Sequence, residues 1–234
     1  MRDKFLKAAA GNQDLLPFEP ELQYVGNFSD TTNATSWTFT SQVTLPVCDG
    51  VLILTYAESD DGTTRRTNSV LLSGPATVGF TEVDSSTNAN TLSYNYSGPI
   101  TVAGTYTMAI TVNLTCRGVV ADVFYENGLD LAGFTDIAVG NPTGPATSFT
   151  TLGMDLVDGS WVILMASHSV NGNSITITDM PNCDYVQVSD VGNGLRAATA
   201  AGKCTATSTE SFTYTTTASS GGPFWLSAVF PADP

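Results

Sequence analysis

The stretch DGVLILTY, residues 49–56, decides the fold of this chain. The turn dipeptide Asp49-Gly50 precedes a run that is almost entirely apolar. A short apolar run after a turn signal predicts a β-strand that is buried on both faces. The stretch DGSWVIL, residues 158–164, repeats the pattern, and each copy leads into a polar turn. The chain is therefore expected to hold two equivalent buried strands, one in each half.

Further strand-like runs surround these two stretches. Several of them alternate polar and apolar residues, and most are rich in β-branched and aromatic side chains. Gly, Pro and Asn separate them, which is typical of a β-sandwich. The expected strands cover residues 36–40, 91–96, 105–112, 119–125, 174–178, 211–214 and 224–230.

The repeat allows two interpretations of the architecture. Two halves could contribute equivalent strands to one sandwich, or two small domains could follow each other along the chain. The best linker between them, GNPTGP at residues 140–145, is short. We therefore predict an all-β fold, a single antiparallel β-sandwich of jelly-roll type in which strands from both halves interleave. Residues 21–234 would form this domain, and residues 1–20 an N-terminal arm and connector.

Charge is unevenly distributed along the 234 residues, which carry 8 basic and 22 acidic side chains and a net charge of −14. Three of the basic residues lie before Gly11, beside two large apolar side chains. A basic segment on an acidic body predicts docking onto an acidic partner surface. We name this candidate site the attachment arm; its residues are Arg2, Lys4, Phe5, Leu6 and Lys7.

Composition also excludes several classes of partner. A strongly acidic body is repelled by phosphate backbones, so direct nucleic-acid binding is not expected. No run approaches the ~18 apolar residues of a membrane span. No apolar segment follows the basic residues near Met1, so a secretory signal is not expected either.

Catalytic and metal-binding patterns are weak. His168 is the single histidine, and no G-x-S-x-G motif accompanies it. The loop carboxylates form no calcium-binding loop, and their clustering is expected by chance in an acidic chain. We predict no enzymatic activity, no cofactor and no metal. The carboxylates considered were Glu58, Asp60, Asp61, Glu126, Asp130 and Asp136.

Four cysteines occur, at Cys48, Cys116, Cys183 and Cys204, without a C-x-x-C spacing. Cys183 and Cys204 flank a turn-rich stretch and could meet across paired strands. Without a secretory signal, buried free thiols are the expected state.

The second half carries a resemblance to a known class of module. Its Asp158-Gly159 strand is followed by GLRAATAAG, residues 194–202, and by a closing strand FWLSAVFP, residues 224–231. This succession resembles the β-sandwich modules of tailed-bacteriophage structural proteins and bacterial surface proteins, over about residues 36–231. The resemblance implies a structural or adhesive role and transfers no catalytic residue.

The expected function follows from this resemblance together with the arm. We predict an accessory virion structural protein of a bacteriophage, a capsid decoration or fibre component made in the host cytoplasm. Its partners would be other virion proteins such as the major capsid protein, and edge strands favour a homo-oligomer. The alternative is a glycan-binding adhesion module of a phage tail or cell surface. That alternative needs exposed aromatic side chains, whereas Trp37, Trp161 and Trp225 are expected in the core.

Overall fold

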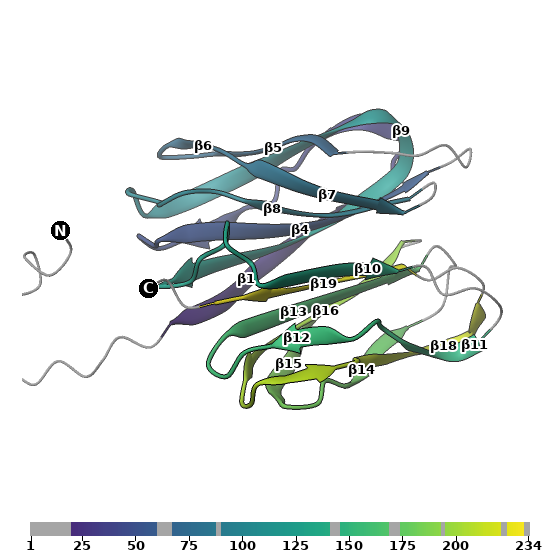
Figure 1. Ribbon diagram of the computed structural model, residues 1–234. Coiled ribbons are helices and arrows are strands. Elements are labelled where there is room, and N and C mark those ends of the chain that lie inside the picture. The colour runs from purple at the N-terminus through teal and green to yellow at the C-terminus, as the bar shows by residue number, and fades with distance from the viewer. Residues whose placement is uncertain are drawn as a thin grey trace, which may run out of the picture.

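The computed structural model describes residues 20–59, 67–87, 90–140, 146–168, 174–192, 195–220 and 224–231. Within these ranges the secondary structure consists of β-strands, and every pairing between strands is antiparallel (Figure 1). The prediction of an all-β, antiparallel fold is confirmed. The attachment arm lies outside the described residues.

The first half of the chain forms one nine-stranded sheet. Its strands are β1 (Glu21–Asp30), β2 (Ala34–Thr38), β3 (Val43–Leu45), β4 (Gly50–Ser59), β5 (Thr67–Ser73), β6 (Thr77–Gly79), β7 (Thr81–Thr87), β8 (Asn90–Tyr96) and β9 (Gly104–Asn127).

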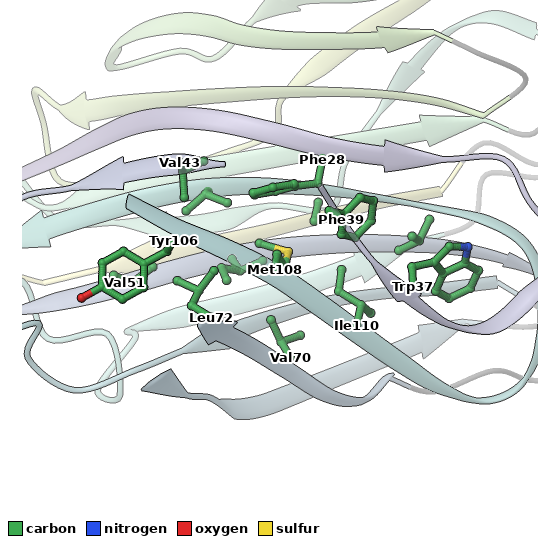
Figure 2. Packing of buried hydrophobic residues seen from close by; sticks show 14 of the residues in the cluster. Phe28, Trp37, Phe39, Val43, Val51, Val70, Leu72, Tyr106, Met108 and Ile110 are labelled. Carbon is green, nitrogen blue, oxygen red and sulfur yellow. The ribbon is translucent and has the colours of Figure 1, made fainter. Parts of the chain in front are cut away.

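Strand β9 folds this sheet into two layers. Residues 116–127 pair with β1 and β4, whereas residues 104–112 pair with β3, β5 and most of β2. The first residue of β2, Ala34, pairs with Cys116. Three successive exposed residues, Asn113, Leu114 and Thr115, separate these two parts of β9. The apolar faces of both layers enclose one core, which Figure 2 shows around Phe28, Trp37 and Met108.

The second half repeats this arrangement with separate sheets. A five-stranded sheet has the order β10-β19-β13-β16-β15, and a three-stranded sheet has the order β11-β18-β14. A further pair joins β12 to β17. The strands are β10 (Asp136–Gly140), β11 (Ala146–Thr150), β12 (Met154–Leu156), β13 (Trp161–His168), β14 (Ile175–Asp179), β15 (Cys183–Gly192), β16 (Arg196–Cys204), β17 (Ser208–Glu210), β18 (Thr213–Ser220) and β19 (Phe224–Phe230).

The two halves share one strand order. In the first half β1, β9, β4, β8 and β7 are neighbours in that sequence, and β10, β19, β13, β16 and β15 match them one by one. The opposite layers match as well, with β2-β9-β5 corresponding to β11-β18-β14. The sequence ATSWT of β2 even returns as ATSFT in β11. The repeat expected from residues 49–56 and 158–164 therefore extends over both halves, with β4 and β13 in equivalent central positions.

The expected interleaving of strands from both halves does not occur among the described pairings, and a single jelly-roll sandwich is not confirmed. Each half completes its hydrogen-bond ladders within itself. The halves meet instead through the side chains of two large sheet surfaces, which face each other in Figure 1. The described strands therefore stack as four layers, two from each half.

The core between the halves explains the two-sided burial of the central strands. In β4, Val51 and Ile53 face the first-half core, whereas Leu52 and Leu54 face the second half. All four side chains are fully buried, as the sequence predicts. In β13, Ile163 and Met165 face the first half, and their neighbours Val162 and Leu164 face the second-half core. A strand that separates two cores needs apolar residues on both faces.

Aromatic side chains fill much of this core between the halves. Phe230 on β19 packs edge-on against Tyr94 on β8, with ring centroids 5.7 Å apart. Phe134 packs edge-on against the same ring at 5.6 Å. On the same face of the sheet, Tyr24 on β1 packs edge-on against Phe124 on β9, with ring centroids 5.4 Å apart. Such edge-on pairs add to the stabilisation from burial alone.

Truncating a side chain in this core should destabilise the whole chain. Phe124 is fully buried between the halves, and removing a buried Phe side chain costs about 3–5 kcal/mol. Phe124→Ala should lower the free energy of unfolding by that amount in a denaturant titration. Val186→Ala on β15, where the side chain is 67% exposed, is the matched control and should change it by less than about 0.5 kcal/mol. Equal effects of the two substitutions would contradict the four-layer packing.

Candidate functional site

A buried carboxylate lies in the layer between the two halves. The predicted strand from Val119 to Tyr125 is part of β9, and its Val120 and Phe124 side chains face the second half. Asp122 occupies the position between them on the same face, and its exposure is 0%. Our sequence analysis did not single it out. The available signal was an acidic residue at an inward-facing position of an otherwise apolar strand.

Hydroxyl groups from the second half satisfy this carboxylate. Oδ2 of Asp122 accepts hydrogen bonds from Ser189 Oγ on β15 at 2.8 Å and from Thr199 Oγ1 on β16 at 2.6 Å. Oδ1 accepts a longer bond of 3.5 Å from the hydroxyl of Tyr24 on β1. Asn27 donates in turn to the Tyr24 oxygen at 3.1 Å. The carboxylate thus connects β1 and β9 of one half to β15 and β16 of the other.

Burial dominates the protonation equilibria of this cluster. It raises the pKa of Asp122 to about 6, although hydrogen bonds from Thr199, Ser189 and Tyr24 oppose the rise. It also raises the pKa of Tyr24 to about 12, with the charge of Asp122 adding to the effect. An ionised carboxylate in an apolar layer is costly unless it is hydrogen-bonded. The cluster therefore links the two halves through the hydrogen bonds of Asp122, and the fold is more stable when Asp122 is protonated because the cost of burying its charge is removed.

A second buried acid lies at the end of β4. Glu58 has 5% of its side chain exposed, and its Oε1 accepts a hydrogen bond of 3.5 Å from Nη1 of the exposed Arg117. Burial raises the pKa of Glu58 to about 7, and the charge of Arg117 opposes the rise. This pair joins β4 to β9 within one half. Asp60 and Asp61, which follow Glu58 in the sequence, lie outside the described residues.

The remaining candidate carboxylates accept hydrogen bonds from backbone N–H groups. Oε2 of Glu126 accepts the backbone N–H of Leu129 at 2.8 Å, and Asp130 Oδ1 accepts the N–H groups of Ala132 and Gly133, with all of these donors in the segment after β9. Asp136 Oδ2 on β10 accepts the N–H of Asp155 on β12 at 2.9 Å. Each of these acids is therefore occupied by backbone donors.

The histidine and the carboxylates weighed for catalysis or metal binding do not come together in the described part of the chain. His168 lies at the end of β13, opposite Arg196 of β16. No group of three or more His, Cys, Asp or Glu residues that could hold a metal ion occurs in the described ranges. The same ranges contain no helix with the length and apolar character needed to cross a lipid bilayer.

The aromatic residues considered for glycan binding are mostly in the cores. Trp37, Trp225, Tyr94 and Tyr214 are each at most 4% exposed. A depression of about 290 Å³ lies beside residues 76–79 and 98–101, but the Tyr106 side chain at its base is fully buried. The Tyr106 hydroxyl donates to the carbonyl of Val102 at 2.6 Å. No aromatic face in this depression is open for stacking on a sugar.

Trp161 marks the place where the connector meets the body. Its indole Nε1 donates a hydrogen bond of 2.9 Å to the carbonyl of Pro20, the first described residue. Trp161 is on β13 and is paired with Phe230 near the end of β19. The two ends of the described chain therefore lie at one end of the stacked sheets (Figure 1). The residues of the attachment arm, Arg2, Lys4, Phe5, Leu6 and Lys7, precede this point and lie outside the described residues.

Comparison with known proteins gives no relative. No family model, no curated protein and no solved structure matches this chain. Two features of the chain itself remain as guides to its role: a buried polar link between two repeated halves, and a fixed departure point for the connector.

Acidification should stabilise the folded chain, and Asp122 should account for part of the effect. The carboxyl pKa is raised to about 6 in the fold and is about 3.9 in an unfolded chain. The folded state binds the proton more tightly, so this stability is present at low pH and is lost as the pH rises through about 6. Between pH 7 and pH 5, Asp122→Asn should reduce the gain in unfolding free energy by about 1 kcal/mol.

The control for this measurement is Asp184→Asn, which removes a carboxylate from an exposed position on β15. This variant should keep the full gain on acidification in parallel denaturant titrations. Glu58 acts in the same direction and remains in both variants. An Asp122→Asn chain with the wild-type dependence on pH would show that the buried link is not what titrates.

Proposed function

We propose that this chain is an accessory virion structural protein of a bacteriophage, either a capsid decoration protein or a fibre component. The observation that carries the proposal is the fixed departure of the connector at Trp161. A hydrogen bond holds Pro20 against β13, beside the end of β19. An arm that starts from this point can attach to a particle while the opposite end of the stacked sheets projects from it.

The body suits such a mechanical role. Three apolar cores hold its layers together, and one of them joins the two halves. Its polar exterior depends largely on Ser, Thr and Asn, because only 13% of the residues are charged. On this proposal the acidic body is repelled by nucleic acid, whereas the basic arm binds an acidic surface such as that of a major capsid protein.

The jelly-roll interpretation now applies to each half separately and remains part of the proposal. A jelly roll pairs two four-stranded layers from two Greek keys. The first half has β1-β9-β4-β8 in one layer and β2-β9-β5-β6 in the other, with β9 serving both and β7 added to the first layer beside β8. The second half has the equivalent five-stranded layer and a three-stranded layer, β11-β18-β14. On this proposal both halves are variants of one jelly roll. Jelly rolls are common in viral capsid proteins, which favours a virion role over an enzymatic one.

Oligomer formation belongs to the same proposal. The five-neighbour layers of the two halves end in β1, β7, β10 and β15, which have a pairing partner on one side. Edge strands can pair with strands of neighbouring copies. A homo-oligomer around the particle would use these edges.

Deleting residues 1–12 should abolish particle association without unfolding the body. Tagged full-length and shortened chains would be produced in cells that make the particles, and the particles would be purified on density gradients. The full-length chain should be recovered in a fixed ratio to the capsid protein, and the shortened chain at less than about a tenth of that level. An unchanged thermal midpoint of the shortened chain is the control for folding.

Two further variants separate the contributions of the arm. Arg2→Gln, Lys4→Gln and Lys7→Gln together should weaken association in a salt-dependent manner, because surface charges are screened by salt. Phe5→Ala with Leu6→Ala should weaken it independently of salt. Unchanged recovery of the shortened chain, or binding of a free monomer to a glycan array, would overturn the proposal in favour of the adhesion alternative.

A further inference from the structure

Two of the four cysteines lie directly opposite each other on neighbouring strands. Cys183 begins β15, Cys204 ends β16, and the antiparallel register pairs them. Both are free thiols. The other two cysteines have no such neighbour, because Cys48 is bridged to Ile100 and Cys116 is paired with Ala34.

The backbone hydrogen bonds show whether Cys183 and Cys204 form a hydrogen-bonded or a non-hydrogen-bonded antiparallel pair. The N–H of Cys204 donates to Ser160 O at 2.8 Å, and the Cys204 carbonyl accepts from Gly159 N at 2.9 Å. Its backbone groups therefore point away from β15. The adjacent residue Thr205 instead donates to Asn182 O at 2.8 Å. Cys183 and Cys204 thus form a non-hydrogen-bonded pair, for which Cα atoms are about 4.5 Å apart.

This geometry fits a disulfide. Disulfides join residues whose Cα atoms are about 4.4–6.8 Å apart. The side chains of a non-hydrogen-bonded pair also lie closer together than those of other cross-strand pairs. Cys183 Sγ donates a hydrogen bond of 3.4 Å to the carbonyl of Pro181, and the proximity of Cys204 shifts the pKa values of the two thiols in opposite directions. Residues at the spacing of such a pair can be bridged without backbone movement.

The two thiols differ in burial and in acidity. Cys183 is half-buried, whereas Cys204 is 1% exposed. The neighbouring Cys183 thiol lowers the pKa of Cys204, assisted by Ser160, although burial opposes this. The pKa of Cys183 is raised by the same interaction and by burial. A thiol pair in which one member is more acidic than a free cysteine is suited to thiol–disulfide exchange.

We propose that Cys183 and Cys204 form a reversible oxidation site that closes to a cross-strand disulfide with a low-molecular-weight disulfide, R–S–S–R, as oxidant. One cysteine thiolate attacks R–S–S–R, forms a mixed disulfide and releases one R–SH. The second thiolate then attacks the mixed disulfide, forms the Cys183–Cys204 bond and releases the second R–SH. The two cysteine sulfurs lose two electrons in total, and both thiol protons end on the two R–SH molecules.

The Cys183–Cys204 disulfide would join the edge strand β15 covalently to β16. Strand β15 is the outer strand of the second-half sheet, and its Ser189 reaches Asp122 between the halves. The disulfide closes the loop formed by residues 183–204 and so restricts the unfolded chain. This inference does not depend on the proposed function, since it needs only the pairing of β15 with β16.

The test uses the full chain, reduced and then equilibrated in glutathione buffers of increasing glutathione-disulfide content. Free thiols counted in denaturant should fall from the four of the sequence to two. Peptide mapping should place the bond between Cys183 and Cys204. The thermal midpoint should rise by about 5–10 °C and return after dithiothreitol treatment.

Three variants make the result specific. Cys48→Ser should still lose two thiols, because Cys48 takes no part in the bond. Cys183→Ser with Cys204→Ser should lose none, and its thermal midpoint should be the same in both buffers. Cys204→Ser alone should retain glutathione on Cys183, since the displacing thiol is missing. Retention of all four thiols, a bond mapped to Cys48 or Cys116, or a lasting mixed disulfide on wild-type Cys183 would each overturn the proposal.

Discussion

The burial of both faces of β4 and β13 is the constraint on which the rest of this structure depends. Each strand carries one apolar face into the core of its own half and the other into the core that joins the halves. Neither half can leave the other without exposing residues such as Leu54, Ile163 and Phe230 to water, which costs about 25 cal/mol per Å² of apolar surface. The repeated halves consequently stack into one body, although no strand of one half pairs with a strand of the other in the described ranges.

Polar groups set the lateral position of the two sheets in this apolar contact. Asp122 is surrounded by apolar neighbours in β9, and its hydroxyl partners come from both halves, so the sheets have one favoured lateral position. The cysteine pair lies on the same two strands, β15 and β16, that supply Ser189 and Thr199. One edge of the second-half sheet therefore carries both groups that respond to solution conditions, one to pH and the other to oxidants.

Much of the fold could be predicted from local patterns. Alternation and turn residues identified the strands, and the matching Asp49-Gly50 and Asp158-Gly159 stretches identified the repeat. The single interleaved sandwich is not confirmed. It was predicted because the best linker candidate, residues 140–145, is short. In the structure the first half ends with β9 at Asn127 and the second half begins with β10 at Asp136, so the expected linker falls within the second half. The apolar runs of β4 and β13 contained the missing information, since strands in a lone sandwich bury one face only. Asp122 was missed because its partners are distant in sequence. The attachment arm lies outside the described residues and stays a prediction.

The most direct test of this account is scanning calorimetry of the reduced full chain. If one shared core unites the halves, the chain should unfold in a single transition whose calorimetric and van't Hoff enthalpies agree. Phe124→Ala should move that whole transition to lower temperature. Two separate transitions, of which Phe124→Ala shifts only the one belonging to the first half, would contradict the claim that burial on both faces of β4 and β13 makes the two halves one structure.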